Sequence, residues 1–559
     1  MTAFACLLFS GSARAQLYLN GRAAAYDSLT STYLFSVDES LFDEGSYVAT
    51  ITLDADSAWS NVSIEGADIA TGDTLRLNLT GGGYSSLTAR RPDGSDVSAG
   101  ISFTCMPIVS LRGDFGYDYS EGTVSLYMPY ASDETDEDCC EMSAKLKWRG
   151  GVTNQPLRQK RNYHIKFLKE DGTKKNRQFF GLRKDNDWIL DANQIDLGRC
   201  RNRIATDLWN ETFATSPYYA DSEPEALSGT RGRMVEVFLN DEYRGIYAMT
   251  ENVDAKQMCL VDYDEDTETQ HGHLWKTTSY TDATMMLASM AFDGTLEECN
   301  GFDTKHPDFD DVSPTDYSII ANAVRFVAES SDEDFSDSVT VYFDMPVMVN
   351  YFIFLNVTQA VDNNSKNLFY ACYDEQESTM LTPAVWDLDC TFGQYFTDGV
   401  GFFHMSTLGP EVDYMSTWND SNLFGRLAEL DWFNSMVSDR YNALRDSGMT
   451  AESIAERFET MIGMYIKCGA AAREATRWNG CYDISYRELD FDGELEFIVD
   501  WISRRIVYLD GLFLTEAVSA VPAIRTDNDA TFSISGRRVD SRNLQPGIYI
   551  RNGKKFIVR

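Results

Sequence analysis

The segment DNNSKNLFYACYDEQESTMLTPAVWDLDCTFG, residues 362–393, places acids and an amide at the ends of two apolar runs. Asp362 lies five positions before Asn367, and Asp387 and Asp389 follow the second run. Two apolar runs around a polar turn predict a strand pair. A carboxylate can accept a hydroxyl proton, and carboxylate and amide oxygens are ligands for Mg²⁺. The segment therefore predicts a site that orients a hydroxyl group and binds a metal–nucleotide complex.

The spacing from Asp362 to Asn367 is D-x-x-x-x-N, which is also the spacing of the catalytic Asp and metal-binding Asn of protein kinases. Because Asp and Asn are abundant in this chain, an exposed hairpin with acidic ends is an alternative interpretation. A hydrolase is another, since residues i and i+2 on one strand share a face and Asp387 could work with Asp389 or with Asp362.

Composition and charge restrict the class of protein. A chain of 559 residues is long enough for more than one domain, and 43% hydrophobic and 13% aromatic residues indicate a globular protein. The formal net charge is −39 at pH 7. Such a surface repels phosphate backbones and anionic lipids, so binding to nucleic acid or to a membrane surface is not expected as the main role.

One segment has the opposite charge. From Lys145 to Arg203 there are sixteen Lys or Arg residues against six Asp or Glu residues. A basic island in an acidic chain predicts an anionic ligand, although a solvated basic face is the alternative. Gly150 and Gly151 follow a strand-like run, and Lys166 lies on the next one. This order resembles the phosphate-covering layout of kinases, without a G-x-G-x-x-G or Walker A motif.

The N-terminus suggests export. The apolar run AFACLLF is followed by Ala13-Arg14-Ala15, an A-x-A-like cleavage site before Gln16, although a positive n-region is missing. No other stretch has the roughly 18 uninterrupted apolar residues that a spanning helix needs, so no transmembrane segment is expected. Ten cysteines lie beyond this segment without a C-x-x-C pair, and zinc binding is therefore poorly supported.

Three parts follow the predicted signal peptide of residues 1–15. Residues 16–103 alternate apolar and polar positions in short runs such as YVATITLDA, which predicts a β-sandwich-like module. Residues 104–515 mix strand-like runs with helical periodicity, as in DYSIIANAVRFVAES and MPVMVNYFIFLNVTQAV. Residues 518–559 predict two strand pairs with turns at SGRR and RNGKK.

Several blocks together resemble the CotH family of spore-coat-type atypical protein kinases. These blocks, in the order of the family, are LKWRGGVTNQPLRQKRNYHIKF, DWILDANQIDLGRCRNRIATDLW, VEVFLNDEYRGIYAMTENV, DNNSKNLFYACYD and LTPAVWDLDCTFG. The resemblance implies an α+β fold in which a divergent protein-kinase-like domain carries the β-rich N-terminal module and a small β C-terminal tail. It also implies ATP- and Mg²⁺-dependent phosphorylation of secreted or surface proteins, with Mn²⁺ as a second candidate metal.

The resemblance implies a role for each matching residue. Asp362 would be the catalytic base, and Asn367 would help to hold the metal. Asp387, or alternatively Asp389, would be the carboxylate that binds Mg²⁺. Four further positions would contact the nucleotide. Lys166 would pair with phosphate, donors at the start of a helix would meet phosphate, and Glu251 would partner Lys166 or line the nucleotide cleft; the helix-start donors are Arg199, Arg201 and Asn202.

The C-terminal blocks SISGRRV, LQPGIYI and NGKKFIVR resemble the sorting modules of secreted Bacteroidetes proteins, which implies an extracellular or surface location. The preferred interpretation is thus an exported protein kinase. A surface binding or assembly protein that keeps the kinase-like fold without turnover is the second, and a glycoside hydrolase with paired carboxylates is the third. Nucleotide dependence separates the three classes, because only the kinase needs ATP and metal.

Overall fold

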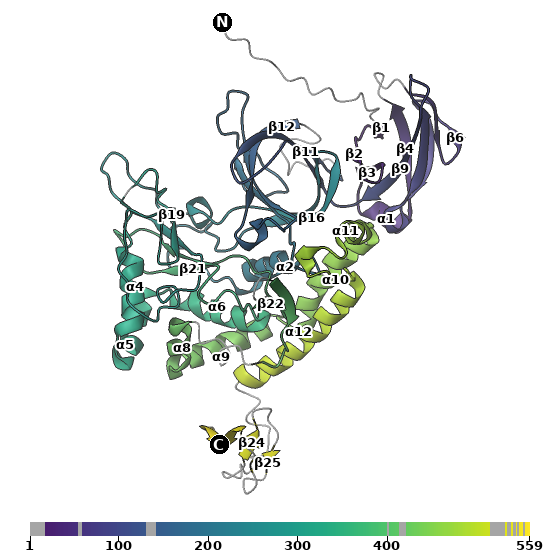
Figure 1. Ribbon diagram of the computed structural model, residues 1–559. Helices are drawn as coiled ribbons and strands as arrows, with labels where there is room; N and C mark the ends of the chain where they lie inside the picture. Colours follow the sequence, from purple (N-terminus) through teal and green to yellow (C-terminus); the bar gives the residue numbers. More distant parts are fainter. Residues whose placement is uncertain are drawn as a thin grey trace. The chain divides into compact units, whose positions relative to one another are not determined.

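The computed structural model describes residues 17–53, 59–129, 141–312, 314–399, 402–412 and 421–514, together with short segments between residues 531 and 558. The predicted signal peptide, Cys139 and Cys140 lie outside these residues. The chain divides into two compact units at Leu509 and Asp510. Helices and sheets are mixed along the first unit, as the α+β prediction requires (Figure 1). No described helix is both long enough and apolar enough to cross a membrane.

The N-terminal part of the first unit consists of two sheets. The three-stranded sheet has the order β1-β4-β7 and the six-stranded sheet the order β2-β3-β9-β8-β5-β6. Buried and exposed positions alternate along β4 and β8, as expected for strands with one face in a core. The bounds are β1 Leu17–Leu19, β2 Ala25–Asp27, β3 Thr32–Ser36, α1 Ser40–Glu44, β4 Ser46–Leu53, β5 Ser60–Ile64, β6 Ala67–Asp68, β7 Thr74–Asn78, η1 Thr80–Gly82, β8 Ser85–Arg90 and β9 Asp96–Thr104.

A closed barrel of seven strands follows, in the order β10-β11-β12-β13-β14-β16-β15. Neighbouring strands are antiparallel except β10 and β15, which close the barrel in parallel. Apolar side chains such as Val109, Ile165 and Trp188 form its core. The bounds are β10 Ile108–Arg112, β11 Ser120–Tyr127, β12 Glu141–Arg149, η2 Val152–Asn154, β13 Asn162–Phe167, β14 Asp187–Asp191, α2 Arg201–Leu208, η3 Trp209–Phe213, β15 Gly232–Leu239 and β16 Glu242–Thr250.

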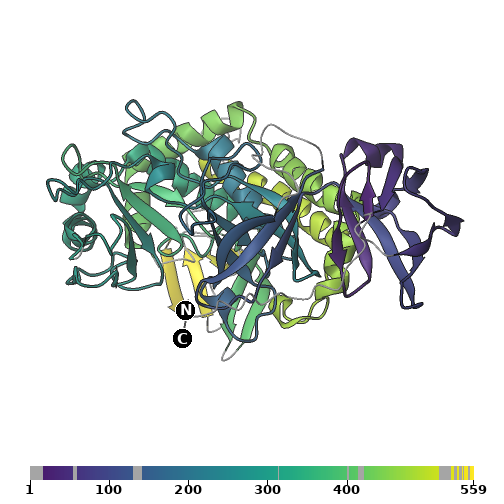
Figure 2. The same ribbon diagram turned by 90° about the horizontal axis from the view of Figure 1, so that it is seen from above.

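A five-stranded antiparallel sheet, β18-β19-β17-β20-β21, lies beside the barrel with helices below it (Figures 1 and 2). Helix α6 is central here, because 13 of its 14 residues are buried, and a helix that is apolar all round belongs inside a core. The bounds are α3 Ala255–Met258, β17 His273–Thr277, β18 Glu298–Cys299, β19 Phe302–His306, α4 Ser318–Glu329, α5 Asp332–Tyr342, α6 Met345–Thr358, β20 Leu368–Cys372 and β21 Thr382–Val385.

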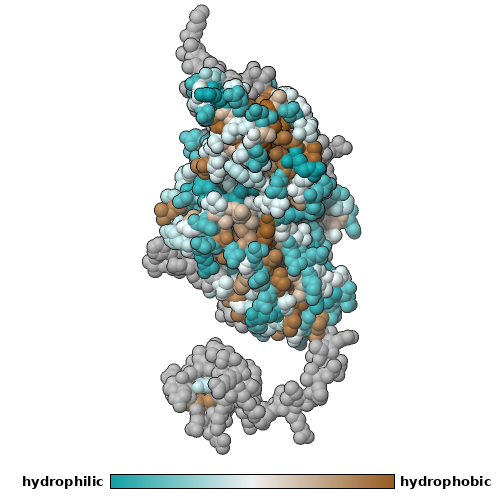
Figure 3. Space-filling model, turned by 90° about the vertical axis from the view of Figure 1, so that its right-hand side faces the viewer, coloured by the Kyte–Doolittle hydropathy of each residue, from teal (hydrophilic) through white to brown (hydrophobic). Residues whose placement is uncertain are grey.

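The remaining helices pack beneath the barrel and the sheet. Helix α9 contacts α6, α11 contacts barrel strand β16, and α10 contacts α2. The bounds are β22 Gln394–Gly399, β23 Phe402–Thr407, α8 Asn422–Ala428, α9 Asp431–Asp446, α10 Ala451–Lys467, α11 Ala470–Trp478, η4 Tyr482–Ile484 and α12 Phe491–Phe513. On the face shown in Figure 3, apolar side chains lie in scattered groups among hydrophilic ones, which is ordinary for a protein surface.

The second unit contains one antiparallel sheet of the order β25-β24-β26-β27. Two strand pairs were expected in this tail, and they join into one sheet because β24 pairs with both β25 and β26. The bounds are β24 Thr531–Ser533, β25 Arg538–Val539, β26 Gly547–Arg551 and β27 Lys554–Val558.

Many side chains of the basic island, from Lys145 to Arg203, are engaged in buried ion pairs. Arg201 has no exposed surface, and its guanidinium lies 2.7 Å from Asp196 Oδ1 and 2.6 Å from Glu494 Oε1. Its Nε also donates to the carbonyl of Thr391 at 3.1 Å. The side chain therefore joins α2 to α12 and to the segment after β21.

We expect Arg201→Ala to lower the free energy of unfolding by about 3–5 kcal/mol, because Asp196 and Glu494 would keep buried charges without a partner. Urea denaturation followed by circular dichroism measures the loss. The matched control is Arg504→Ala on α12, whose side chain is 51% exposed and pairs with Glu411 and Asp500. That change should cost far less, because solvent screens exposed ion pairs. Equal losses in the two variants would contradict the structural role of Arg201.

Candidate active site

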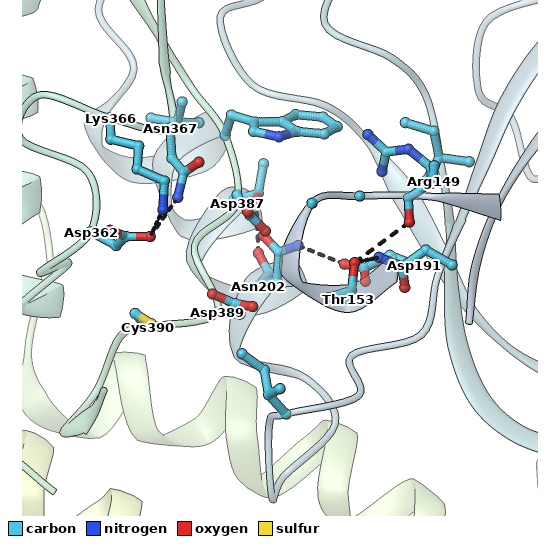
Figure 4. A pocket seen from close by; sticks show the side chains of 18 of the residues that line it. Arg149, Thr153, Asp191, Asn202, Asp362, Lys366, Asn367, Asp387, Asp389 and Cys390 are labelled. Atoms are coloured by element: carbon cyan, nitrogen blue, oxygen red, sulfur yellow. Dashed lines mark hydrogen bonds and ion pairs between the residues drawn. The ribbon is translucent and has the colours of Figure 1, made fainter. Parts of the chain in front are cut away.

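A cavity of about 610 Å³ opens where the barrel meets the five-stranded sheet. Its lining comes from the end of β12, the end of β14, the first turn of α2, strand β17, the loop after α6 and the segment after β21. Five of the predicted site residues line this cavity: Asn202, Asp362, Asn367, Asp387 and Asp389. Figure 4 shows Asp387, Asn202 and Asp389 between a group around Asp362 on one side and Arg149 and Asp191 on the other.

Asp362 is positioned by the buried helix α6. The helix ends at Thr358, Gln359 adopts a left-handed conformation as its C-cap, and the chain turns into the loop that carries Asp362. The Asp362 carboxylate accepts hydrogen bonds from Lys366 Nζ at 2.8 Å, Asn367 Nδ2 at 2.8 Å and the Tyr280 hydroxyl at 3.1 Å. The five-residue spacing read from the sequence thus corresponds to a direct contact between Asp362 and Asn367.

Asp387 and Asp389 lie in a turn that directly follows β21. Asp387 has a left-handed backbone with φ 57°, a conformation that is uncommon for residues other than Gly and is tolerated best by Asn and Asp. The turn is held by Asn202, whose Oδ1 accepts a hydrogen bond from the Leu388 amide at 3.0 Å. Asn202 Nδ2 donates in turn to Asp191 Oδ2 at 2.6 Å. Helix α2 therefore connects the turn after β21 with the end of barrel strand β14.

The two glycines predicted to form a phosphate-covering turn also line the cavity. Gly150 and Gly151 follow the last residue of β12, and Thr153 comes next in the lining. Gly150 has φ 96°, and a Cβ built there would lie 2.0 Å from Thr153 Oγ1. Only glycine fits this turn, which brings backbone close to the cavity.

The carboxylates of the cavity repel one another. Loss of solvation is the largest cause that raises the pKa of Asp191, Asp362 and Asp389 above the ordinary aspartate value. The charge of Asp387 contributes to each of these three pKa shifts. Such a group of acids is a suitable environment for a cation.

The donor set fits a magnesium ion for which substrate phosphates and water supply most of the coordination shell. Among the described residues no three His, Cys, Asp or Glu side chains are arranged as a complete metal site. Mg²⁺ is commonly held by one or two carboxylates, with substrate phosphates and water as the other ligands. Asp387 is exposed and Asp389 is part-exposed, so both can offer oxygens to such an ion, and Asn367, which also lines the cavity, is a third donor.

Two predicted nucleotide-binding residues are not brought to the cavity. Lys166 lies on β13, where Tyr163, Ile165 and Phe167 fill the barrel core. Because side chains alternate along a strand, Lys166 points outward, and its Nζ lies 3.5 Å from Asp187 Oδ2. Glu251 is buried elsewhere.

The Glu251 carboxylate accepts hydrogen bonds from Arg231 Nη2 at 2.8 Å and from the Arg183 amide at 2.9 Å. Glu251 therefore stabilises the segment after β16 and does not partner Lys166.

Arg199 and Arg201 are also structural. Arg199 is fully buried, and its Nε donates to Glu474 Oε1 at 2.7 Å. The expected phosphate site at the start of α2 is already filled, because Asp196 Oδ2 accepts the amides of Cys200 and Arg201 at 2.6 Å each. Of the donors predicted at this helix start, only Asn202 reaches the cavity.

Comparison with known families agrees with the resemblance seen in the sequence. The chain matches the model described as CotH kinase protein over residues 146–509, which is more than half of its length. It belongs to the CotH kinase protein family. No curated protein matches the chain. All of the CotH site residues named above, from Arg149 to Asp389, lie within the matched region, whereas the N-terminal sheets and the C-terminal tail lie outside it.

Several cavity residues of this CotH protein were not predicted from the sequence. They are Arg149, Asp191, Lys276, Tyr280 and Lys366. Arg149 and Asp191 lie inside two of the family blocks, so the block positions could have suggested them. Lys276 and Tyr280 do not belong to a motif that could be recognised in the sequence. They reach the site because β17 pairs with β20.

We expect Asp389→Asn to raise the stability of the ligand-free protein at pH 7, on the order of 1 kcal/mol, because an amide removes a charge whose pKa is raised in the folded state. Because the pKa of Asp389 is raised in the folded state, this carboxyl group binds more protons in the native protein than in the unfolded chain above about pH 4. The wild type therefore regains stability as the pH falls, and the advantage of the variant shrinks toward pH 4.

Thermal unfolding between pH 4 and pH 8 measures this difference, with Asp266→Asn in an exposed turn as the control. A destabilised Asp389→Asn protein, or a gain that does not depend on pH, would contradict the repulsion between the cavity carboxylates.

Proposed function

We propose that this protein is an ATP- and Mg²⁺-dependent protein kinase that phosphorylates hydroxyl side chains of exported or surface proteins. The observation that carries the proposal is that Asp362, Asn367 and Asp387 line one cavity, although they come from two separate segments of the chain. A base for the acceptor hydroxyl and oxygen ligands for the metal are thereby available at the same place.

The order of elements supports the same function. A buried helix leads into a loop with D-x-x-x-x-N, a strand pair follows, and an acid comes directly after its second strand. Protein kinases place their catalytic-loop Asp and Asn and their metal-binding Asp in this order. The barrel supplies the opposite wall with its glycine turn at Gly150. We therefore include a protein-kinase-like arrangement of these elements in the proposal.

Each residue has a defined task in this scheme. When bound, Mg·ATP supplies the transferable γ-phosphoryl group. Asp387 and Asp389 would offer carboxylate oxygens to the metal, and Asn367 would add its amide oxygen, since its hydrogen bond to Asp362 is made through Nδ2. Asp362 orients the acceptor hydroxyl and takes its proton. Most of the catalysis would come from positioning and charge neutralisation.

A binding protein without turnover is the second candidate, and one contact favours it. The Asp362 carboxylate is already engaged by Lys366, Asn367 and Tyr280. A base that keeps all three bonds in the presence of substrate would have little capacity to accept a proton. Export and surface delivery remain predictions from residues 1–15 and from the tail.

We expect Asp362→Asn to bind Mg·ATP with nearly the wild-type affinity and to lose phosphoryl transfer, because an amide cannot accept the hydroxyl proton. Radiolabelled phosphate incorporation into the protein itself and into acidic model substrates measures transfer. A thermal-shift titration measures binding. Transfer at the wild-type rate would show that Asp362 is not the base. A wild type that binds Mg·ATP and incorporates no label would favour the binding protein.

Asp387→Ala should have a different effect. Loss of the metal carboxylate should abolish both autophosphorylation and the stabilisation by Mg·ATP, which is roughly 2.7 kcal/mol for wild type at a ligand concentration of 100 Kd. The control is Asp374→Ala, because Asp374 lies at the far end of β20 and pairs with His271. Metal-dependent stabilisation that persists in Asp387→Ala would remove Asp387 from the metal site.

A further inference from the structure

Two cations from different sheets meet over one aromatic ring in the cavity wall. Arg149 ends barrel strand β12, and Lys276 lies on β17 of the five-stranded sheet. The guanidinium carbon of Arg149 is 5.1 Å and Nζ of Lys276 is 5.4 Å from the ring centroid of Trp386. All three residues line the cavity, and Figure 4 shows Arg149 on the opposite side of Asp387 from Lys366.

These two cations differ from the other basic residues of the cavity because they lack an acidic partner. Lys366 pairs with Asp362 at 2.8 Å, Arg203 with Asp207 at 2.7 Å and Arg158 with Asp483 at 3.8 Å. Among the residues that the structure describes, no carboxylate lies within ion-pair distance of Arg149 or Lys276. Each side chain also makes no hydrogen bond within that part of the chain, so their donors are available to a ligand.

Burial makes the charged forms of the two side chains less favourable than in water. Loss of solvation is the largest cause that lowers the pKa of both side chains, to about 8 for Lys276. Arg149 also lowers the pKa of Lys276, whereas the charge of Asp387 acts in the opposite direction on both side chains. A tryptophan ring attracts cations only weakly compared with a full negative charge. Two unpaired cations beside each other in a cavity wall indicate a site for an anion.

The acids of the cavity restrict which anion this can be. Asp191, Asp387 and Asp389 line the same cavity and would repel a simple carboxylate. A metal-bound polyphosphate would suit both groups of charges, because its metal ion would meet the carboxylates and its outer oxygens would meet the cations. The cavity volume of about 610 Å³ is in the range of cofactor sites. Arg149 is followed directly by Gly150, so a phosphate group could also approach the backbone closely.

From this arrangement we propose that Arg149 and Lys276 form the phosphate subsite of the protein and bind oxygens of a magnesium-bound di- or triphosphate. The inference rests on the proposed function for the identity of the nucleotide, whereas the subsite itself is defined by its charge. The guanidinium can hold two oxygens in a fork, and the ammonium acts as a point charge. Because the two side chains come from different sheets, a bound polyphosphate would link the barrel to the five-stranded sheet.

The test compares the binding of three probes by isothermal titration calorimetry: Mg·ATP, magnesium tripolyphosphate and adenosine. Arg149→Gln and Lys276→Gln should each weaken binding of magnesium tripolyphosphate and of Mg·ATP by tenfold or more, with adenosine affinity unchanged. Lys276→Arg should retain most of the affinity, since it keeps the charge. Lys145→Gln is the matched control, because Lys145 lies on β12 and its ammonium is directed at Tyr119, outside the cavity.

The outcomes separate the subsite from the kinase activity. Wild-type affinity for magnesium tripolyphosphate in both Gln variants, with melting temperatures like wild type, would overturn the subsite. A wild-type protein that does not bind tripolyphosphate would overturn it as well. Should tripolyphosphate binding depend on both cations while no phosphate is transferred from ATP, the subsite stands and the proposed kinase function fails.

Discussion

The cavity depends on one buried carboxylate in helix α11. Glu474 has no exposed surface, and it lies 2.9 Å from Lys160 Nζ and 2.7 Å from Arg199 Nε. Its second oxygen accepts the amide of Ile246 in barrel strand β16 at 2.7 Å. Arg199 Nη1 then donates to three carbonyls of the loop between β14 and α2, those of Asn193, Gln194 and Asp196. This loop joins Asp191, the last residue of β14, to the first turn of α2, which carries Asn202. The Glu474 network therefore helps to hold both residues in the cavity.

The same network explains why charge alone could not show which basic residues of the segment from Lys145 to Arg203 face the cavity. A count of residues does not distinguish a lysine on the outer face of a barrel from an arginine inside a packed interface. Lys166 faces outward because its strand alternates, and Arg199 and Arg201 face inward because acids from α11 and α12 meet them there. Those acids lie about 300 residues further along the chain, a separation at which a local pattern carries no information.

Features that depend on residues close together in the sequence were predictable. The apolar run of α6 and the strands β20 and β21 follow from hydrophobic pattern, and the contact between Asp362 and Asn367 follows from a short spacing. The convergence of Asp362 with Asp387 follows from the strand pairing of β20 and β21. Arg149 and Lys276 show the limit of such arguments, since they lie 127 positions apart and only the packing of a barrel against a sheet brings them to Trp386.

The charges of the cavity also separate by element, and this separation gives the site its character. The turn after β21 and the end of β14 supply acids, whereas the end of β12 and strand β17 supply the cations without acidic partners. Direct pairing between the two groups would neutralise the site and leave nothing for a ligand. The Asn202 side chain counteracts such pairing, because its hydrogen bonds to Asp191 and to the Leu388 amide hold the acidic segments in place. A ligand that carries both positive and negative charge would meet two groups of charges that are already in place, which would lower the reorganisation that binding requires.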